Sequence, residues 1–227
     1  MRLKGIVSIL SIVASAACAH EQASSGPSTA PAGTTASAPA AAASDALASA
    51  GRHAGKLVPI TGAVVTEPYH ALKNGAVVYL EDGPKEPGVG MAATIDNHDM
   101  AFVPFISVVV AGGTVTFGNT DPFVHNAFSP DGEGWNVGDI PSHGTVPKTF
   151  DKPNVYSVLC NLHKNMLAYL VVTPSSYFTK VGADGKYVLS VPPGTYRVTA
   201  WSPRLKPQTQ SITVADAATT LDFDLSR

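Results

Sequence analysis

The stretch Cys160-Asn161-Leu162-His163-Lys164-Asn165-Met166 places a thiol, an imidazole and a thioether within seven residues. Apolar residues alternate with other residues on both sides of it, in residues 155–159 and 167–172. This period of two predicts two β-strands joined by a short loop. We therefore expect the loop to present its three side chains at one edge of a β-sheet, on rigid supports.

A second imidazole, His125, is predicted to lie near the end of another strand. Residues 114–117 alternate like a half-buried strand, and Gly-Asn-Thr-Asp-Pro at residues 118–122 is a dense turn signal just before His125. A loop of this kind brings a side chain to the edge of a sheet. We expect His125 to complete a set of metal-binding side chains with the three in residues 160–166.

One thiolate, two imidazoles and one thioether are the donors of blue-copper sites. Soft sulfur ligands favour reduced copper, whereas imidazoles tolerate both oxidation states. Zinc fits less well, because methionine is a poor zinc ligand and structural zinc sites recruit more Cys or His. Haem attachment through C-x-x-C-H is excluded, because no second Cys is nearby. A Cys–His hydrolase would leave Met166 without a role, and no acid that would orient the imidazole is evident.

These segments, together with Phe102-Val103-Pro104 and the pair His125-Asn126, resemble the cupredoxin family, especially plastocyanin-like and amicyanin-like proteins. The resemblance covers about residues 90–173 and implies a Greek-key β-sandwich, assigned here to residues 84–173. It implies one copper ion in a type 1 (blue) site. The implied ligands are three trigonal side chains and a weak axial Met: His125, Cys160, His163 and Met166.

Asn126 is expected to support the implied copper site. Its backbone amide would donate to the Cys160 sulfur, and its side chain would tie the two ligand loops together. The same resemblance implies that the ring edge of His163 faces solvent. The expected apolar rim around that edge consists of Pro122, Phe123, Leu162, Leu167 and Ala168. His98, which has acidic neighbours, is expected to lie in a solvated loop rather than at a metal.

The function implied is that of a carrier of single electrons, not an enzyme, which docks briefly with redox protein partners. Two alternatives stay open. The same ligands would serve a copper-handling protein, such as a chaperone, a sensor or a sequestering agent. The chain could also be a structural envelope lipoprotein with a vestigial copper site.

Residues 1–17 resemble a bacterial lipoprotein signal peptide. They have a basic start, an apolar stretch too short to span a bilayer, and small residues before Cys18. This implies a lipid on Cys18 and a membrane-anchored protein of the bacterial periplasm or cell envelope. Ser15 stands where Leu is commoner. Cleavage after Ala17 or Ala19, which would release a soluble periplasmic protein, therefore stays open.

Composition predicts a linker after the signal peptide and an all-β chain after the linker. Residues 18–56 are rich in Ala, Ser, Thr, Pro and Gly, have too few large apolar residues to bury a core, and read as a low-complexity linker. Charged residues are only 14% and the net charge is -2, which gives no support for nucleic-acid binding. Short apolar runs and Gly-Pro turns predict an all-β chain.

A second resemblance covers the C-terminal part. Residues 181–189 and 191–201 resemble the carboxypeptidase regulatory-like, transthyretin-type β-sandwich. Asp184-Gly185 and Pro192-Pro193-Gly194 are predicted to make hairpin turns. Residues 174–227 alone are few for a sandwich, and residues 57–83 offer the missing strands. We therefore expect residues 57–83 and 174–227 to form one discontinuous sandwich, with the cupredoxin inserted between them.

Overall fold

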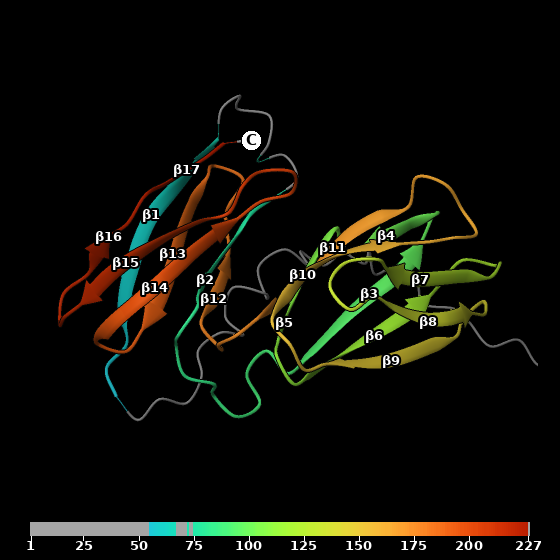
Figure 1. The fold of residues 1–227 in the computed structure, drawn as a ribbon, viewed down its shortest axis with the longest axis horizontal. Coiled ribbons are helices and arrows are strands. Elements are labelled where there is room, and N and C mark those ends of the chain that lie inside the picture. Colours follow the sequence, from blue (N-terminus) through green and yellow to red (C-terminus); the bar gives the residue numbers. More distant parts are fainter. Residues whose placement is uncertain (1–54, 67–71, 73–74, 227) are drawn as a thin grey trace, which may run out of the picture. The chain divides into compact units, whose positions relative to one another are not determined.

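The computed structural model describes residues 55–66, 72 and 75–226 of the 227-residue chain. Strands are the regular elements of this part, which confirms the all-β prediction for it (Figure 1). The expected signal peptide, Cys18 and nearly all of the expected linker lie outside the described residues, so what the sequence predicts for them stays a prediction. None of the described segments forms a helix long and apolar enough to cross a membrane.

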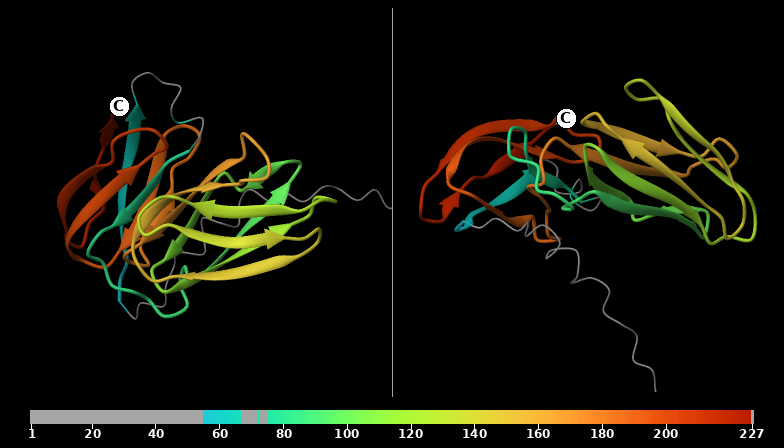
Figure 2. Two further views of the ribbon diagram at one scale, coloured as in Figure 1. Left: turned by 45° about the vertical axis from the view of Figure 1, so that its right-hand side comes forward. Right: turned by 90° about the horizontal axis from the view of Figure 1, so that it is seen from below.

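The first sandwich consists of two β-sheets. One sheet has the strand order β4-β3-β6-β9 and the other β5-β11-β10-β7-β8. The chain passes between the two sheets several times, as in a Greek-key sandwich (Figure 2). The strands are β3 (Ala92–His98), β4 (Ala101–Val103), β5 (Ile106–Val110), β6 (Gly113–Asn119), β7 (His125–Ser129), β8 (Trp135–Ile140), β9 (Thr145–Phe150), β10 (Asn154–Leu159) and β11 (Leu167–Thr173).

Aromatic side chains fill the core between these two sheets. Phe117 on β6 is fully buried, as the alternating pattern of residues 114–117 predicts. Its ring centroid lies 5.4 Å from that of Trp135, which in turn lies 5.4 Å from that of Phe150. Such a core fixes the two sheets against each other and thereby holds the loops at the ends of the strands.

The register of three strands explains why His125 meets the ligand loop. β10 and β11 pair antiparallel up to Leu159 and Leu167, so residues 160–166 connect them, as predicted. β10 also pairs antiparallel with β7, where Leu159 is opposite Phe128. His125 lies three residues before Phe128, and the ligand loop begins directly after Leu159. Because the strands are antiparallel, these two steps lead in the same direction along the sheet. Strand pairing therefore brings the two segments together.

The second sandwich is built from strands that precede and follow the first one in the sequence. β1 pairs with β13, with Val58 opposite Val191, and β2 pairs with β14, with Leu80 opposite Val198. One sheet has the order β13-β1-β16, with β17 also on β1, and the other β12-β2-β14-β15. The domain boundaries at residues 83/84 and 173/174 stay predictions. The strands are β1 (Val58–Thr66), β2 (Val77–Leu80), β12 (Phe178–Lys180), β13 (Lys186–Val191), β14 (Gly194–Trp201), β15 (Gln208–Val214), β16 (Thr219–Thr220) and β17 (Phe223–Leu225).

The two turns in the C-terminal part are not hairpins, so that prediction is wrong. β12 and β13 belong to different sheets, and so do β13 and β14. Gly185 makes a tight turn with φ +80°, and two prolines precede Gly194. Proline has no amide hydrogen for a strand ladder, so residues 192 and 193 cannot extend pairing at the end of β13. β13 and β14 thus lie in different sheets, and their buried side chains, such as Leu189 on β13 and Val198 on β14, pack in the same core.

Candidate metal centre

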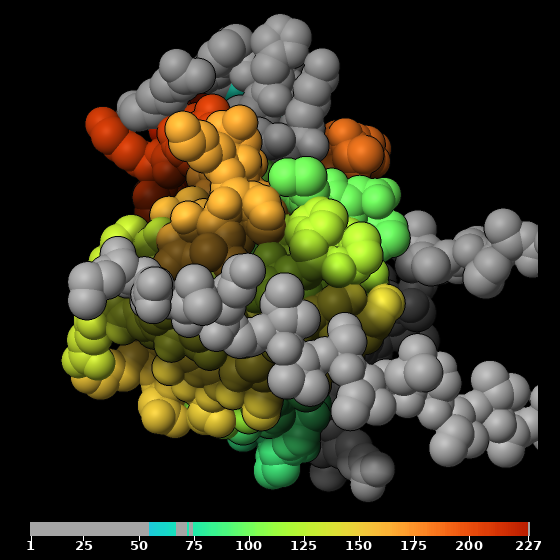
Figure 3. Space-filling view, turned by 90° about the vertical axis from the view of Figure 1, so that its right-hand side faces the viewer, coloured from blue at the N-terminus to red at the C-terminus, as the bar shows by residue number. Residues whose placement is uncertain are grey.

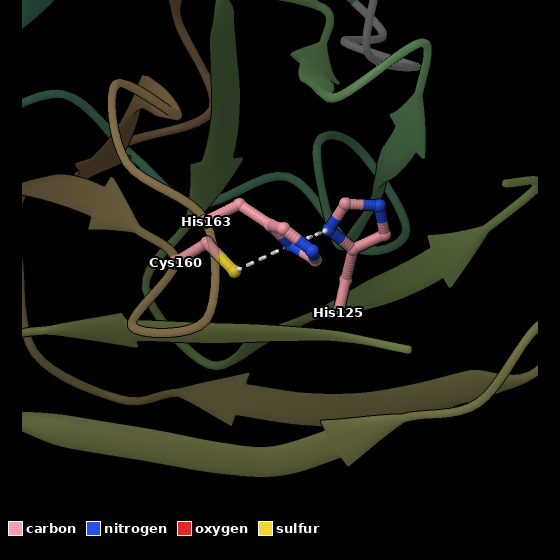
Figure 4. Close-up of side chains that lie close together, drawn as sticks. All are labelled: His125, Cys160 and His163. Atoms are coloured by element: carbon pink, nitrogen blue, oxygen red, sulfur yellow. Dashed lines mark hydrogen bonds between the residues drawn. The ribbon is translucent and has the colours of Figure 1, made fainter. Parts of the chain in front are cut away.

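Three of the four predicted ligand side chains converge at the end of the first sandwich (Figure 4). Nδ1 of His163 lies 3.1 Å from Nδ1 of His125 and 3.8 Å from Sγ of Cys160. The three donor atoms all lie within 4.8 Å of one another. His125 is the first residue of β7, and the other two belong to the loop between β10 and β11.

The separations between donor atoms fit one first-row metal ion. At zinc, metal–nitrogen bonds are about 2.0–2.1 Å long and metal–sulfur bonds about 2.3 Å. Around one such ion, two ligand nitrogens lie about 3.3–3.6 Å apart, and a nitrogen and a sulfur lie about 3.5–3.8 Å apart. The observed 3.1 and 3.8 Å are close to these ranges. Cys160 is a free thiol, as a thiolate ligand must be. The residues present therefore fit a copper ion in chemistry and nearly in spacing.

Met166 ends the loop and points into the sandwich. Asn165 has a left-handed backbone with φ 70°, which asparagine tolerates better than most residues. The side chain of Met166 is buried in the core cluster against which Cys160 packs. This placement is consistent with the axial role, which stays a prediction.

Asn126 does not tie the two ligand loops together, so this part of the prediction is wrong. Its side-chain Nδ2 donates to Oδ1 of Asn136 at 2.8 Å and to the carbonyl of Gly138 at 2.9 Å, both on β8. An irregularity in the register of β7 and β8 between Asn126 and Phe128 accompanies these bonds. Oδ1 of Asn126 is buried without a hydrogen-bond partner. The expected donation from its amide to Cys160 stays a prediction.

Sequence reasoning missed Asp121, which contacts His125 directly. Oδ2 of Asp121 accepts a hydrogen bond from Nε2 of His125 at 2.8 Å, and both side chains are buried. Burial of the Asp121 carboxyl alone would raise its pKa, but hydrogen bonds from Met100, His125 and Asp99 outweigh it and leave the pKa below its ordinary value. An acid four residues before the histidine, in a turn, is the signal that could have found it.

Buried Asn119 holds the loop that carries Asp121. Its Oδ1 accepts from the amide of Asp121 at 3.0 Å, and its Nδ2 donates to the carbonyls of Phe123 and Ile140 at 2.8 and 2.9 Å. The hydroxyl of Ser142 donates to the carbonyl of Asp121 at 2.7 Å. Several hydrogen bonds within the protein thus fix residues 119–123.

Asp121 also removes one objection to a Cys–His hydrolase, because it supplies an orienting acid for an imidazole. The objection that a hydrolase leaves Met166 without a role stands, and His163 adds a further one. Nδ1 of His163 lies close to both Nδ1 of His125 and Sγ of Cys160. A nucleophile and one base do not require a third donor at the same point, whereas a metal ion does.

The predicted apolar rim is only partly present. The side chains of Phe123 and Leu162 are exposed, but Ala168 is fully buried in β11 and cannot contribute to a surface. The ring centroid of Phe123 lies 5.1 Å from that of His125 and 5.4 Å from that of His163. In Figure 3 the orange region of the chain, which includes the ligand loop, adjoins the green segments on one face.

His98 is exposed, as expected, but it is the last residue of β3 and not part of a loop. Its Nδ1 lies 3.0 Å from the hydroxyl of Thr120 and its Nε2 lies 3.5 Å from a carboxylate oxygen of Asp99. His98, Asp99 and Asp121 could offer oxygen and nitrogen atoms to a cation. Asp121 is already engaged with His125, so we assign no metal to this group.

Comparison with known proteins finds a viral relative of part of the chain. Structural protein 27 of a virus (isolate Australia/Victoria) is 34% identical over 85 residues. That match covers 37% of this chain, and the chain spans only 17% of the length of that relative.

Solved structures similar to the chain include cupredoxins. A purple cupredoxin from Nitrosopumilus maritimus is 23% identical, with a TM-score of 0.33, over 36% of this chain and 99% of that one. A mutant amicyanin is 19% identical, with a TM-score of 0.34, over 42% and 97%. A copper-containing nitrite reductase from Thermus scotoductus SA-01 is 24% identical, with a TM-score of 0.35, over 48% and 28%.

One family model matches the C-terminal part of the chain. It matches residues 166–226, which include β12 to β17 and the strand before them. This agrees with the second resemblance drawn from the sequence. Residues 166–226 thus carry the sequence pattern of the carboxypeptidase regulatory-like domain.

Proposed function

We propose that this protein carries single electrons by means of one copper ion held by His125, Cys160 and His163, with Met166 as a weak fourth ligand. The observation that supports it most is the convergence of two imidazole nitrogens and one thiol sulfur from separate segments. Copper would supply a one-electron couple at this point. The donor set, one thiolate with two imidazoles, is the one that type 1 copper sites use.

The surroundings of His125 and Cys160 suit electron transfer rather than substrate chemistry. His125 is fully buried at the start of a paired strand, and Cys160 directly follows Leu159, which pairs with β7 and β11. Side chains on such supports move little when the charge at the site changes. A small movement means a small reorganisation cost for each electron transferred, so the framework favours rapid exchange.

His163 provides the expected route for electrons to and from a partner. Its side chain is half-buried, whereas His125 is fully buried. The exposed side chains of Phe123 and Leu162 lie in the two segments that carry the ligands. A small apolar surface of this kind suits brief docking of a redox protein. Anchorage of the protein to a bacterial envelope membrane through Cys18 is part of this proposal.

The experiment that tests the proposal is copper loading of the full-length protein followed by voltammetry. We expect an intense visible absorption, a reversible one-electron wave and rapid self-exchange between oxidised and reduced protein. Copper that binds but passes to a competing chelator without a stable redox wave would contradict electron transfer and favour the copper-handling alternative. Failure to bind copper at all would contradict both.

The two histidines should respond differently to substitution by glycine. In His163→Gly the lost ring leaves a gap open to solvent, so added imidazole is expected to restore most of the visible absorption. In His125→Gly the gap is fully buried beside Asp121, so the same imidazole should restore little. Titration of both copper-loaded variants with imidazole measures this. Equal recovery in the two variants would contradict the assigned exposures.

A further inference from the structure

We propose that Asp121 is a positioning residue of the metal centre: its buried carboxylate fixes the ring of His125 with Nδ1 toward the metal and favours the oxidised ion. This inference rests on the proposed function for its effect on copper. Its effect on the ring does not depend on copper. The two parts can therefore be tested separately.

The hydrogen bonds around Asp121 define the state of the His125 ring. Oδ1 of Asp121 accepts from the amide of Asp99 at 2.7 Å, and Oδ2 accepts from the amide of Met100 at 3.0 Å. Amide groups can only donate, so both carboxylate oxygens act as acceptors. An ionised carboxylate has no proton to donate, so the contact of 2.8 Å to Nε2 of His125 is a donation from the ring. The lone pair is left on Nδ1, the atom that faces His163.

The turn that supplies the two amides has an unusual backbone. Asp99 and Met100 both have left-handed φ angles, of 51° and 58°, in the connection between β3 and β4. Two such residues in succession are typical of a type I′ turn, for which Asn-Gly is the favoured sequence. A strained backbone persists only where its surroundings hold it. Here the conformation points both amides at one buried carboxylate.

A carboxylate on the far nitrogen of a ligating imidazole changes what the metal experiences. It raises the basicity of the ring and fixes its orientation. It also places a negative charge close to the metal inside the protein, where solvent screens it little. Oxidised copper carries one more positive charge than reduced copper, so it gains more from that charge. Asp121 should therefore lower the reduction potential of the site.

Asp121→Asn tests the effect on copper, because it keeps the shape of the side chain and removes its charge. We expect the affinity for Cu(II) to fall about 10–100-fold, as is usual when a partner of a metal ligand is lost. The affinity for Cu(I), measured by competition with a chromophoric chelator, should fall by a factor about ten times smaller than the factor for Cu(II). That difference corresponds to a rise of about 59 mV in the potential of a one-electron couple.

Asp139→Asn is the charge-matched control. Asp139 is exposed on β8 and pairs with Asn126, the neighbour of His125, so the substitution removes the same charge from a solvated position. Its effect on the potential should be much smaller, because water and salt screen an exposed charge. Equal shifts in the two variants would overturn the role of Asp121 in the potential.

Nitrogen-15 NMR of the metal-free wild-type protein tests the positioning itself and needs no variant to fold. We expect the His125 ring to carry its proton on Nε2. A ring protonated only on Nδ1 would overturn the proposal, whatever copper does. If the proton is on Nε2 but the wild-type protein binds no copper, the proposed function fails and the positioning stands.

Discussion

Cys160→Ser is expected to abolish the intense visible absorption of the copper-loaded protein. The absorption of a blue-copper site depends on the bond between thiolate and oxidised copper, and a serine hydroxyl is a hard, protonated ligand that cannot replace it. We also expect the affinity for Cu(I) to fall at least about 100-fold, because the variant loses the strongest soft donor. Absorption spectra and chelator competition on the full-length protein measure both effects.

The second cysteine of the sequence supplies the control for this experiment. Cys18→Ser removes a thiol outside the ligand loop, so the copper-loaded variant should keep its absorption. Cys160 is only partly buried and follows the end of β10, so its replacement should leave the sandwich folded, which circular dichroism can check. An unchanged spectrum in Cys160→Ser would rule out the thiolate site.

Gly62→Ala is expected to destabilise the second sandwich by about 3 kcal/mol, at the upper end of the range for overpacked positions. A Cβ added at Gly62 would lie 1.9 Å from the carbonyl oxygen of Leu221 and 2.7 Å from its carbonyl carbon. The same carbonyl oxygen accepts a hydrogen bond from Tyr187, so the backbone there cannot move away without losing it. Urea unfolding measures the change in the free energy of unfolding.

Gly55→Ala is the matched control for the crowding at Gly62. No atom lies within 4 Å of a Cβ added at Gly55, so its free energy of unfolding should stay within about 0.5 kcal/mol of the wild type. The comparison also tests the discontinuous architecture. β1 meets Leu221 only if residues before the first sandwich pair with the C-terminal strands. Equal stability of the two variants would contradict that pairing.

Much of the ligand-bearing framework could be predicted because it depends on local patterns. The alternation in residues 155–159 and 167–172 defines β10 and β11, and a seven-residue gap leaves little choice but a loop between them. His125 follows a turn and lies at a strand end, as predicted, and the structure shows that it is the first residue of β7. These features need only the period of two and the chemistry of turn residues.

The missed contact of Asp121 is only four residues from His125 in the sequence, but the amides that hold its carboxylate are more than 20 residues away. The partnership of Asp121 with His125 relies on a turn at Asp99 and Met100, whose left-handed backbone no local sequence preference requires. The resemblance predicts that the Asn126 side chain ties the two ligand loops together, but its Nδ2 donates to Asn136 and Gly138 on β8.

The turns of the second sandwich show the same limit. Asp184-Gly185 is a tight turn, as its sequence predicts, and Gly185 has the expected positive φ. Turn chemistry says how sharply the chain bends, but not which sheet the next strand joins. That choice depends on which partner strands are free, and β1 and β2, more than 100 residues earlier, take the places beside β13 and β14.

The most direct test of the metal centre is X-ray absorption spectroscopy at the copper edge of the loaded, full-length protein. We expect one short copper–sulfur distance together with the scattering pattern of two imidazole rings, and loss of the sulfur shell in Cys160→Ser. A copper ion surrounded only by nitrogen and oxygen would contradict the site formed by His125, Cys160 and His163.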